Sequence, residues 1–156
     1  MIANATENIF GNKICNLYIS AAAGSSGTLS VVGVISAETS TGGSYVKNIY
    51  NNYIDTLYVR ANADASPLYN SIVTAINIPT ATLGNGSNIN IYKNKISHLI
   101  PFGTTSIARG IWLQSIVATT GNAYIHNNMI NLDMTEAFDG ANPASLNAPD
   151  AVRGID

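Results

Sequence analysis

Apolar and polar positions along the chain repeat with a long period. The pattern Ile-x-x-Asn-x-Ile occurs four times, and its asparagines follow one another at spacings of 40, 42 and 34 residues. With 20 Ile and 20 Asn among 156 residues, fewer than one match is expected by chance. The four asparagines are Asn12, Asn52, Asn94 and Asn128. A period in this range is typical of solenoid proteins, in which each repeat stacks on the next.

A second motif alternates with the first. It has two apolar residues, a variable one, a small or β-branched one and a final Ile, and its copies span residues 31–35, 72–76, 107–111 and 151–155. Runs of Ile, Val, Tyr and Thr bounded by Asn, Gly and Ser favour short strands and turns. In the clearest copy they predict strands over residues 31–37, 45–50 and 53–59. Variable loops are expected at residues 21–28, 61–69, 80–87 and 135–149.

The first motif predicts a corner between two strands. Both of its Ile residues face the same buried side, so the chain must bend between them. Asn tolerates a left-handed backbone better than most residues, and stacked amides can hydrogen bond to one another. We therefore expect the four asparagines to form one column in the left-handed conformation. The expected aliphatic core consists of Ile14, Leu17, Ile35, Ile49, Ile54, Leu57, Ile76, Ile91, Ile96, Leu99, Ile111, Ile125 and Ile130.

The clearest repeat reads Val-x-x-Ile-Tyr-Asn-Asn-x-Ile-x-x-Leu, from Val46 to Leu57. With the Gly-Ile phrase of the second motif, it resembles the right-handed parallel β-helices of the pectate-lyase-like superfamily. It is most similar to the repeat arrays in secreted surface proteins of Bacteroidetes-type bacteria. The resemblance implies an all-β, right-handed parallel β-helix of about four coils with three short strands each. A β-sandwich also has many short strands, but it gives no reason for Asn at the same corner four times.

Composition narrows the possible functions. Charged residues make up 10% of the chain and its net charge is −2, which gives no electrostatic basis for binding nucleic acid or an anionic membrane surface. Polar residues interrupt every apolar stretch, so no membrane-spanning helix is expected. The single Cys15 excludes an internal disulfide. Charge-poor chains rich in Asn, Ser and Thr are common among bacterial surface proteins, so we expect an extracellular or cell-surface location.

The repeat offers little catalytic chemistry. Enzymes of the pectate-lyase-like superfamily bind Ca²⁺ through clustered carboxylates, whereas no aligned column here contains two acids. We therefore assign no catalytic residue and no cofactor. Asp133, Glu136 and Asp139 form a weak candidate Ca²⁺ site in a loop, for which a solvated loop is the alternative. His98 and His126 fall in different columns, which argues against a shared metal site.

One column of rings is the candidate binding surface. The residue after the first Ile of each motif carries a ring, at Phe10, Tyr50, Tyr92 and His126. Rings in register outside a sheet can stack on sugar faces, and they can equally pack on one another. Arg109 and Arg153 are expected to be neighbours one coil apart, either as solvated side chains or as a clamp for an anion.

These patterns favour a structural or adhesive β-helical module over residues 1–156. We expect it to belong to a longer array or to stack end to end into a fibre, so its partners are further copies or neighbouring coils, with glycans as a further possibility. The alternative is a carbohydrate-active or glycan-binding β-helix whose catalytic coil is absent or unrecognised. A column of carboxylates would discriminate the two, because the enzyme requires one.

Overall fold

The computed structural model describes residues 5–21, 28–37, 44–61, 70–79, 81–83, 86–101, 107–114, 116–118, 120–132 and 152–155. All regular structure in this part of the chain is β-strand. The clearest repeat is confirmed with adjusted ends. Its strands are β3 (Thr28–Ile35), β4 (Tyr45–Tyr50) and β5 (Tyr53–Ala61).

Strands from equivalent places in each repeat stack on one another. Sheet A contains β1 (Ala5–Phe10), β4, β8 (Asn88–Tyr92) and β12 (Asn122–His126). Sheet B contains β2 (Lys13–Ala21), β5, β9 (Lys95–Ile100) and β13 (Met129–Asn131). Sheet C contains β3, β6 (Asn70–Ile78), β10 (Ile107–Leu113) and β14 (Val152–Ile155). A short sheet D pairs β7 (Ala81–Leu83) with β11 (Ile116–Ala118).

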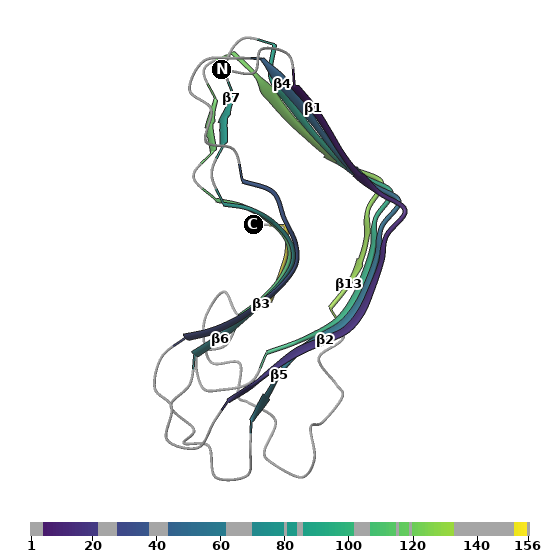
Figure 1. Ribbon diagram of the computed structural model, residues 1–156, viewed down its shortest axis with the longest axis vertical. Coiled ribbons are helices and arrows are strands. Elements are labelled where there is room, and N and C mark those ends of the chain that lie inside the picture. Colours follow the sequence, from purple (N-terminus) through teal and green to yellow (C-terminus); the bar gives the residue numbers. More distant parts are fainter. Residues whose placement is uncertain are drawn as a thin grey trace.

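The described strands form a parallel β-helix of four coils. Every strand pair is parallel, for example β1 with β4 and β4 with β8, which excludes the antiparallel β-sandwich. Viewed along the stack, the coils superimpose, and sheet C curves with its convex side toward sheets A and B (Figure 1). One expectation is wrong in detail, because residues 80–87 contain strand β7 as well as loop.

The interior is filled by stacked aliphatic side chains from sheets A, B and C. The expected core is confirmed in the two middle coils, where the side chains are 0–1% exposed at Ile49, Ile54, Leu57, Ile76, Ile91, Ile96, Leu99 and Ile111. In the first and last coils the inward residues Ile14, Ile125 and Ile130 are half-buried, and Leu17 is 41% exposed. In sheets A and B, burial therefore depends on having a neighbouring coil on each side, as in other solenoids.

The first copy of the second motif is shifted by one residue from the expected alignment. Val34, not Ile35, pairs with Ile76, and Ile35 pairs with Asn77. Ile35 is accordingly 62% exposed while Val34 is 6% exposed. The expected burial of Ile35 is wrong because a strand that slips by one residue exchanges its two faces.

Close approach of neighbouring atoms before the last apolar residue of this motif explains the small side chains there. A Cβ atom on Gly33 would lie 2.8 Å from the backbone oxygen of Ala75, and one on Gly110 would lie 2.7 Å from Cγ2 of Ile130. Two consecutive residues face inward here, at Gly33 and Val34, so the strand bends around the interior. The chain therefore packs tightly against its neighbours at this position.

The corner between sheets A and B is held by an asparagine ladder, the column Asn12, Asn52, Asn94 and Asn128. Nδ2 of the first three asparagines donates to Oδ1 of the asparagine in the next coil, at 3.0, 2.9 and 2.9 Å along the column. The same oxygens accept the backbone N–H of the preceding asparagine at 3.0–3.1 Å. Nδ2 of Asn52, Asn94 and Asn128 also donates to a carbonyl one coil earlier. The expected column is confirmed, and it satisfies backbone groups as well as amides.

The left-handed conformation lies one residue before the ladder. Positive φ angles occur at Gly11 (68°), Asn51 (55°), Lys93 (56°) and Asn127 (55°). The expectation that Asn52 and Asn94 adopt this conformation is therefore wrong. The preceding residue makes the turn, and the ladder asparagine is then placed inside the corner, where its amide reaches the neighbouring coils.

Replacement of Ile54 by Ala is expected to lower the free energy of unfolding by about 2–5 kcal/mol, because the side chain is 0% exposed. Ile35→Ala is the matched control and is expected to have a much smaller effect, since that side chain is 62% exposed. Chemical denaturation of both variants measures the difference. Equal losses would contradict the strand register given above.

Replacement of Asn94 by Val is expected to lower the free energy of unfolding by at least about 1–3 kcal/mol. The change leaves the carbonyl of Ile49 and the backbone N–H of Asn52 without their side-chain partners in a buried corner. Asn131→Val, at an exposed outward position of β13, is the control and is expected to be nearly neutral. A thermal midpoint of Asn94→Val equal to that of wild type would count against the ladder.

Candidate functional site

The aromatic column runs along the outer face of sheet A and is confirmed as a stack. Parallel register pairs Phe10 with Tyr50, Tyr50 with Tyr92 and Tyr92 with His126. Ring centroids are 5.0, 5.0 and 5.3 Å apart, and the ring planes differ by 6°, 1° and 5°. The rings of Tyr50 and Tyr92 therefore cover one another's faces. A sugar could stack on a ring face only at the two ends of the column, and elsewhere it would meet ring edges and hydroxyls. Glycan binding by this column stays a prediction.

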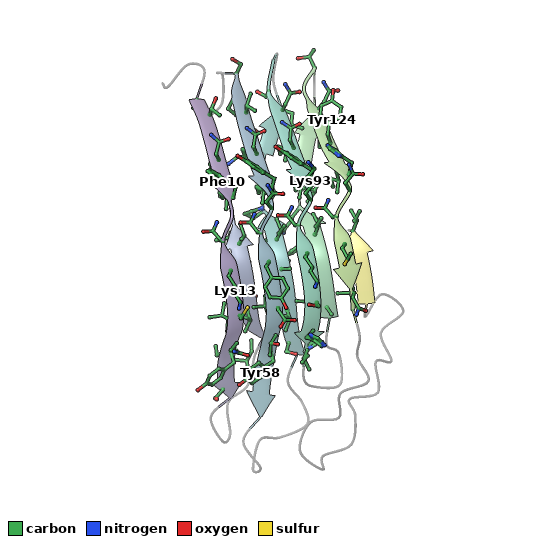
Figure 2. The ribbon with its side chains drawn as sticks, turned by 90° about the vertical axis from the view of Figure 1, so that its right-hand side faces the viewer. Phe10, Lys13, Tyr58, Lys93 and Tyr124 are labelled. Atoms are coloured by element: carbon green, nitrogen blue, oxygen red, sulfur yellow. The ribbon has the colours of Figure 1, made fainter. Side chains whose placement is uncertain are left out.

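A second amide ladder lies beside the rings on the outer face of sheet A. Nδ2 of Asn48 donates to Oδ1 of Asn8 at 2.9 Å, and Nδ2 of Asn90 donates to Oδ1 of Asn48 at 2.8 Å. Figure 2 shows the side chains of this face in rows across the strands, with Phe10 and Tyr124 at opposite ends. Sequence reasoning missed this ladder, although Asn-Ile followed by Phe or Tyr occurs in three of the repeats.

The outer face of sheet B carries a polar cluster that sequence reasoning also missed. Oδ1 of Asp55 accepts a hydrogen bond from Oγ of Ser97 at 2.6 Å and lies 2.6 Å from Nδ1 of His98. Thr56 Oγ1 donates to the other carboxylate oxygen at 3.2 Å. Burial opposes ionisation of Asp55, but the hydrogen bonds from Ser97, His98 and Thr56 outweigh it and hold the pKa of this carboxyl below its ordinary value.

Backbone geometry brings the histidine to this carboxylate. Asn16, Thr56 and His98 occupy equivalent positions and have φ angles of 57°, 54° and 49°. The residues on either side of this left-handed position stay in register from coil to coil: Cys15 pairs with Asp55 and Asp55 with Ser97, and Leu17 pairs with Leu57 and Leu57 with Leu99. His98 thus reaches back one coil to Asp55. The sequence repeat shows that the three positions are equivalent, but it does not predict the left-handed bend in the backbone.

Aromatic and cationic side chains flank the cluster on sheet B. Nζ of Lys13 and of Lys95 lie 5.9 and 5.3 Å from the ring centroid of Tyr53, one from each neighbouring coil. The negative charge of Asp55 raises the pKa of Tyr53. Further along, Tyr18 and Tyr58 stack with their centroids 5.0 Å apart. Along the outer face of sheet B, small networks of charged side chains therefore alternate with stacked rings. Each network or stack links two or three coils.

A charge pair links the first and second coils at an inward-facing position of sheet A. Lys47 is 3% exposed, and its Nζ donates to Oε2 of Glu7 at 2.7 Å and to Oγ of Ser36 at 2.6 Å. Oγ of Ser36 in turn donates to Oε2 of Glu7 at 2.7 Å. Burial opposes ionisation of Glu7, but its hydrogen bonds with Lys47 and Ser36 and the Lys47 charge outweigh it and lower the pKa of this carboxyl. The sequence pattern did not predict charged side chains at these inward-facing positions of sheet A.

The outer, concave face of sheet C presents a different arrangement. Cζ of Arg109 lies 3.9 Å from the ring centroid of Trp112 on the same strand, and the two residues between them, Gly110 and Ile111, are buried. In the coil before, Oγ1 of Thr74 and Oδ1 of Asn77 are buried and have no hydrogen-bond partner. Arg153 pairs in register with Arg109, as expected. Buried polar groups are nearly always bonded, so this face merits a test for ligand binding.

The remaining candidates take no part in these arrangements. Asp133, Glu136 and Asp139 lie outside the described residues. His126 belongs to sheet A and His98 to sheet B, and the described residues include no group of three or more His, Cys, Asp or Glu side chains placed to hold a metal ion. Cys15 is a half-buried free thiol. In the described ranges there is no helix long and apolar enough to cross a membrane.

Comparison with known proteins gives no match. No protein-family model matches the chain, and no curated protein and no solved structure is significantly similar to it. Its function must therefore be inferred from the fold and from the side-chain arrangements described above.

The Asp55 cluster predicts a specific loss of stability in acid. A carboxyl with a lowered pKa in the folded state contributes stability above its unfolded-state pKa of about 4, and this contribution disappears as the pH falls through the folded-state value. We expect the thermal midpoint of wild type to fall more steeply than that of Asp55→Asn when the pH is lowered from 7 to 3. Glu7 is present in both proteins, so the difference isolates Asp55. Parallel curves would contradict this role.

Proposed function

We propose that the chain is a structural module of a β-helical protein on the bacterial cell surface, with an adhesive role. The observation that carries the proposal is the repetition of side-chain ladders from coil to coil, with amides at the corner and amides and rings outside. Such ladders use side-chain chemistry to hold coils together. They favour a scaffold over a catalytic surface.

The proposed cell-surface location and the proposed kinship with known β-helices are supported by the fold and by the composition. Four stacked coils of parallel strands fit the proposed kinship with the pectate-lyase-like superfamily and with surface repeat proteins of Bacteroidetes-type bacteria. A chain with 10% charged residues and abundant Asn, Ser and Thr fits an extracellular environment. A module of this kind would continue into further coils, as part of a longer array or of a fibre.

A glycan-binding role is the second candidate, and the outer face of sheet C favours it. Asn77 and Thr74 are 7% and 1% exposed, and each has a buried oxygen without a partner. Sugar hydroxyls are suitable donors to such oxygens, and Trp112 with its stacked Arg109 offers an aromatic and cationic platform. This candidate places the ligand on sheet C, away from the aromatic column of sheet A.

The structural proposal predicts two results together. On intact cells that carry the protein, added protease or antibody is expected to reach it, and the purified chain is expected not to cleave polyuronic acids in the presence of Ca²⁺. Release of unsaturated sugars would contradict the structural role.

A glycan array tests the second candidate function. Binding that is lost in Asn77→Ala and Trp112→Ala but kept in Tyr50→Ala would assign the glycan site to sheet C.

A further inference from the structure

We propose that Tyr50 and Tyr92 form an oxidative modification site, at which a one-electron oxidant of the haem-peroxidase class joins the two phenol rings by a carbon–carbon bond. The product is a dityrosine that links the second coil covalently to the third. This inference goes beyond the structural role proposed above, because it assigns a reaction to the outer face of sheet A.

The parallel register brings the two phenols together in the middle of the solenoid. Tyr50 on β4 pairs with Tyr92 on β8, their ring centroids are 5.0 Å apart and their planes differ by 1°. Both side chains are half-buried on the outer face, so an oxidant in solution can reach the edge of each ring. Two radicals formed there already lie side by side, and the coupling step needs no diffusional encounter.

The rest of this aromatic column contributes no competing phenol. Phe10 stacks on Tyr50, and His126 stacks on Tyr92. Neither of these outer rings carries a hydroxyl group, from which the radical chemistry starts. Coupling within the column is therefore restricted to the two tyrosines at its centre.

The reaction balances with hydrogen peroxide as the final oxidant. The peroxidase removes one electron from each phenol, whose proton passes to solvent, and this leaves two phenoxyl radicals. A bond forms between the ring carbons ortho to the two oxygens. The hydrogen on each of these carbons then moves through solvent to the oxygen of its own ring, which restores both phenols. Overall the pair loses two hydrogen atoms, and one hydrogen peroxide becomes two molecules of water.

The rings must leave the parallel stack to meet edge to edge. The torsion about the Cβ–Cγ bond of tyrosine has a broad energy well, so rotation of the rings is inexpensive. Because the column lies on the outer face, the ring edges turn through solvent and the buried core is not disturbed.

A second pair with the same geometry lies on the outer face of sheet B. Tyr18 and Tyr58 pair in register, with ring centroids 5.0 Å apart and planes that differ by 15°. The next position in this column is Ile100, so this stack also contains two phenols. The same oxidant is expected to link this pair.

The other described tyrosines are placed differently. Tyr45 is 4% exposed and faces inward. Tyr53 pairs in register with a lysine in each neighbouring coil, and Tyr124 pairs with an asparagine. The fold therefore directs coupling to the two stacked pairs and away from these three residues.

Peroxidase treatment of the purified chain tests the site. Dilute wild-type protein with a haem peroxidase and limiting hydrogen peroxide is expected to stay monomeric, to gain dityrosine fluorescence and to lose two hydrogen atoms in mass for each link. Digestion under reducing conditions, so that a disulfide through Cys15 is not counted, is expected to join the peptides that carry Tyr50 and Tyr92. Oxidation of Met129 adds oxygen, so mass spectrometry distinguishes it.

Phenylalanine variants separate the site from its surroundings. Tyr92→Phe keeps a ring in the stack, as Phe10 already does, and is expected to lose the link at Tyr50 while the Tyr18 link forms normally. Tyr124→Phe removes a side chain that is 50% exposed and is expected to leave both links unchanged. Treated wild type is expected to melt at a higher temperature than treated Tyr92→Phe, because a covalent link restricts the unfolded chain.

The same treatment in denaturant shows the coupling that occurs without the fold. Links there are expected to spread over all tyrosines and to join separate chains. A folded wild type that shows this same spread, or that forms no link between Tyr50 and Tyr92, would overturn the proposal. The test needs only the purified chain, so its result is independent of the cell-surface and glycan experiments.

Discussion

The fold depends on how the backbone is satisfied at one corner. A chain that turns between two strands leaves N–H and C=O groups pointing away from both sheets, and a buried corner offers them no water. The ladder asparagines solve this in every coil, since each amide bonds its neighbours' backbone as well as their side chains. Because the bonds run from one coil to the next, they also fix the coils in register. The alignment of the aliphatic interior and of the outer columns follows from that register.

Exact register has a consequence for the outer surface. Like side chains fall on like side chains, so rings stack on rings and amides bond to amides. The surfaces that would otherwise recognise a ligand, the ring faces and amide groups, are used within the solenoid. Groups suited to ligand binding occur where neighbouring coils carry different side chains at the same position. Sheet B brings an acid, a serine and a histidine together across two coils, and sheet C leaves buried oxygens without partners.

Repetition made the corner column, the strand order and most of the core predictable from the sequence, because four copies average out local ambiguity. The errors arise where one copy differs. The sequence alignment placed Ile35 at the inward position because the other copies of the motif end in Ile. In the structure the neighbouring Val34 occupies that position. The left-handed residue could have been found, since Gly11, Asn51 and Asn127 precede three ladder asparagines. The Asp55 and His98 contact could not, because it joins different columns through a bend in the strand that no spacing reveals.

The buried charge pair shows how the interior changes along the stack. A lysine that is 3% exposed is costly unless its ammonium is paired and hydrogen bonded. Lys47 is tolerated because its ammonium points toward the first coil, where Ser36 and the carboxylate of Glu7 complete its hydrogen bonds and the side chain of Glu7 is 44% exposed. The carboxylate thus stays hydrated while it neutralises the buried ammonium. In sheet A the interior passes from aliphatic in the third coil, at Ile89, to polar in the first. The two ends of the solenoid therefore differ in chemistry inside as well as in the direction of the amide ladder.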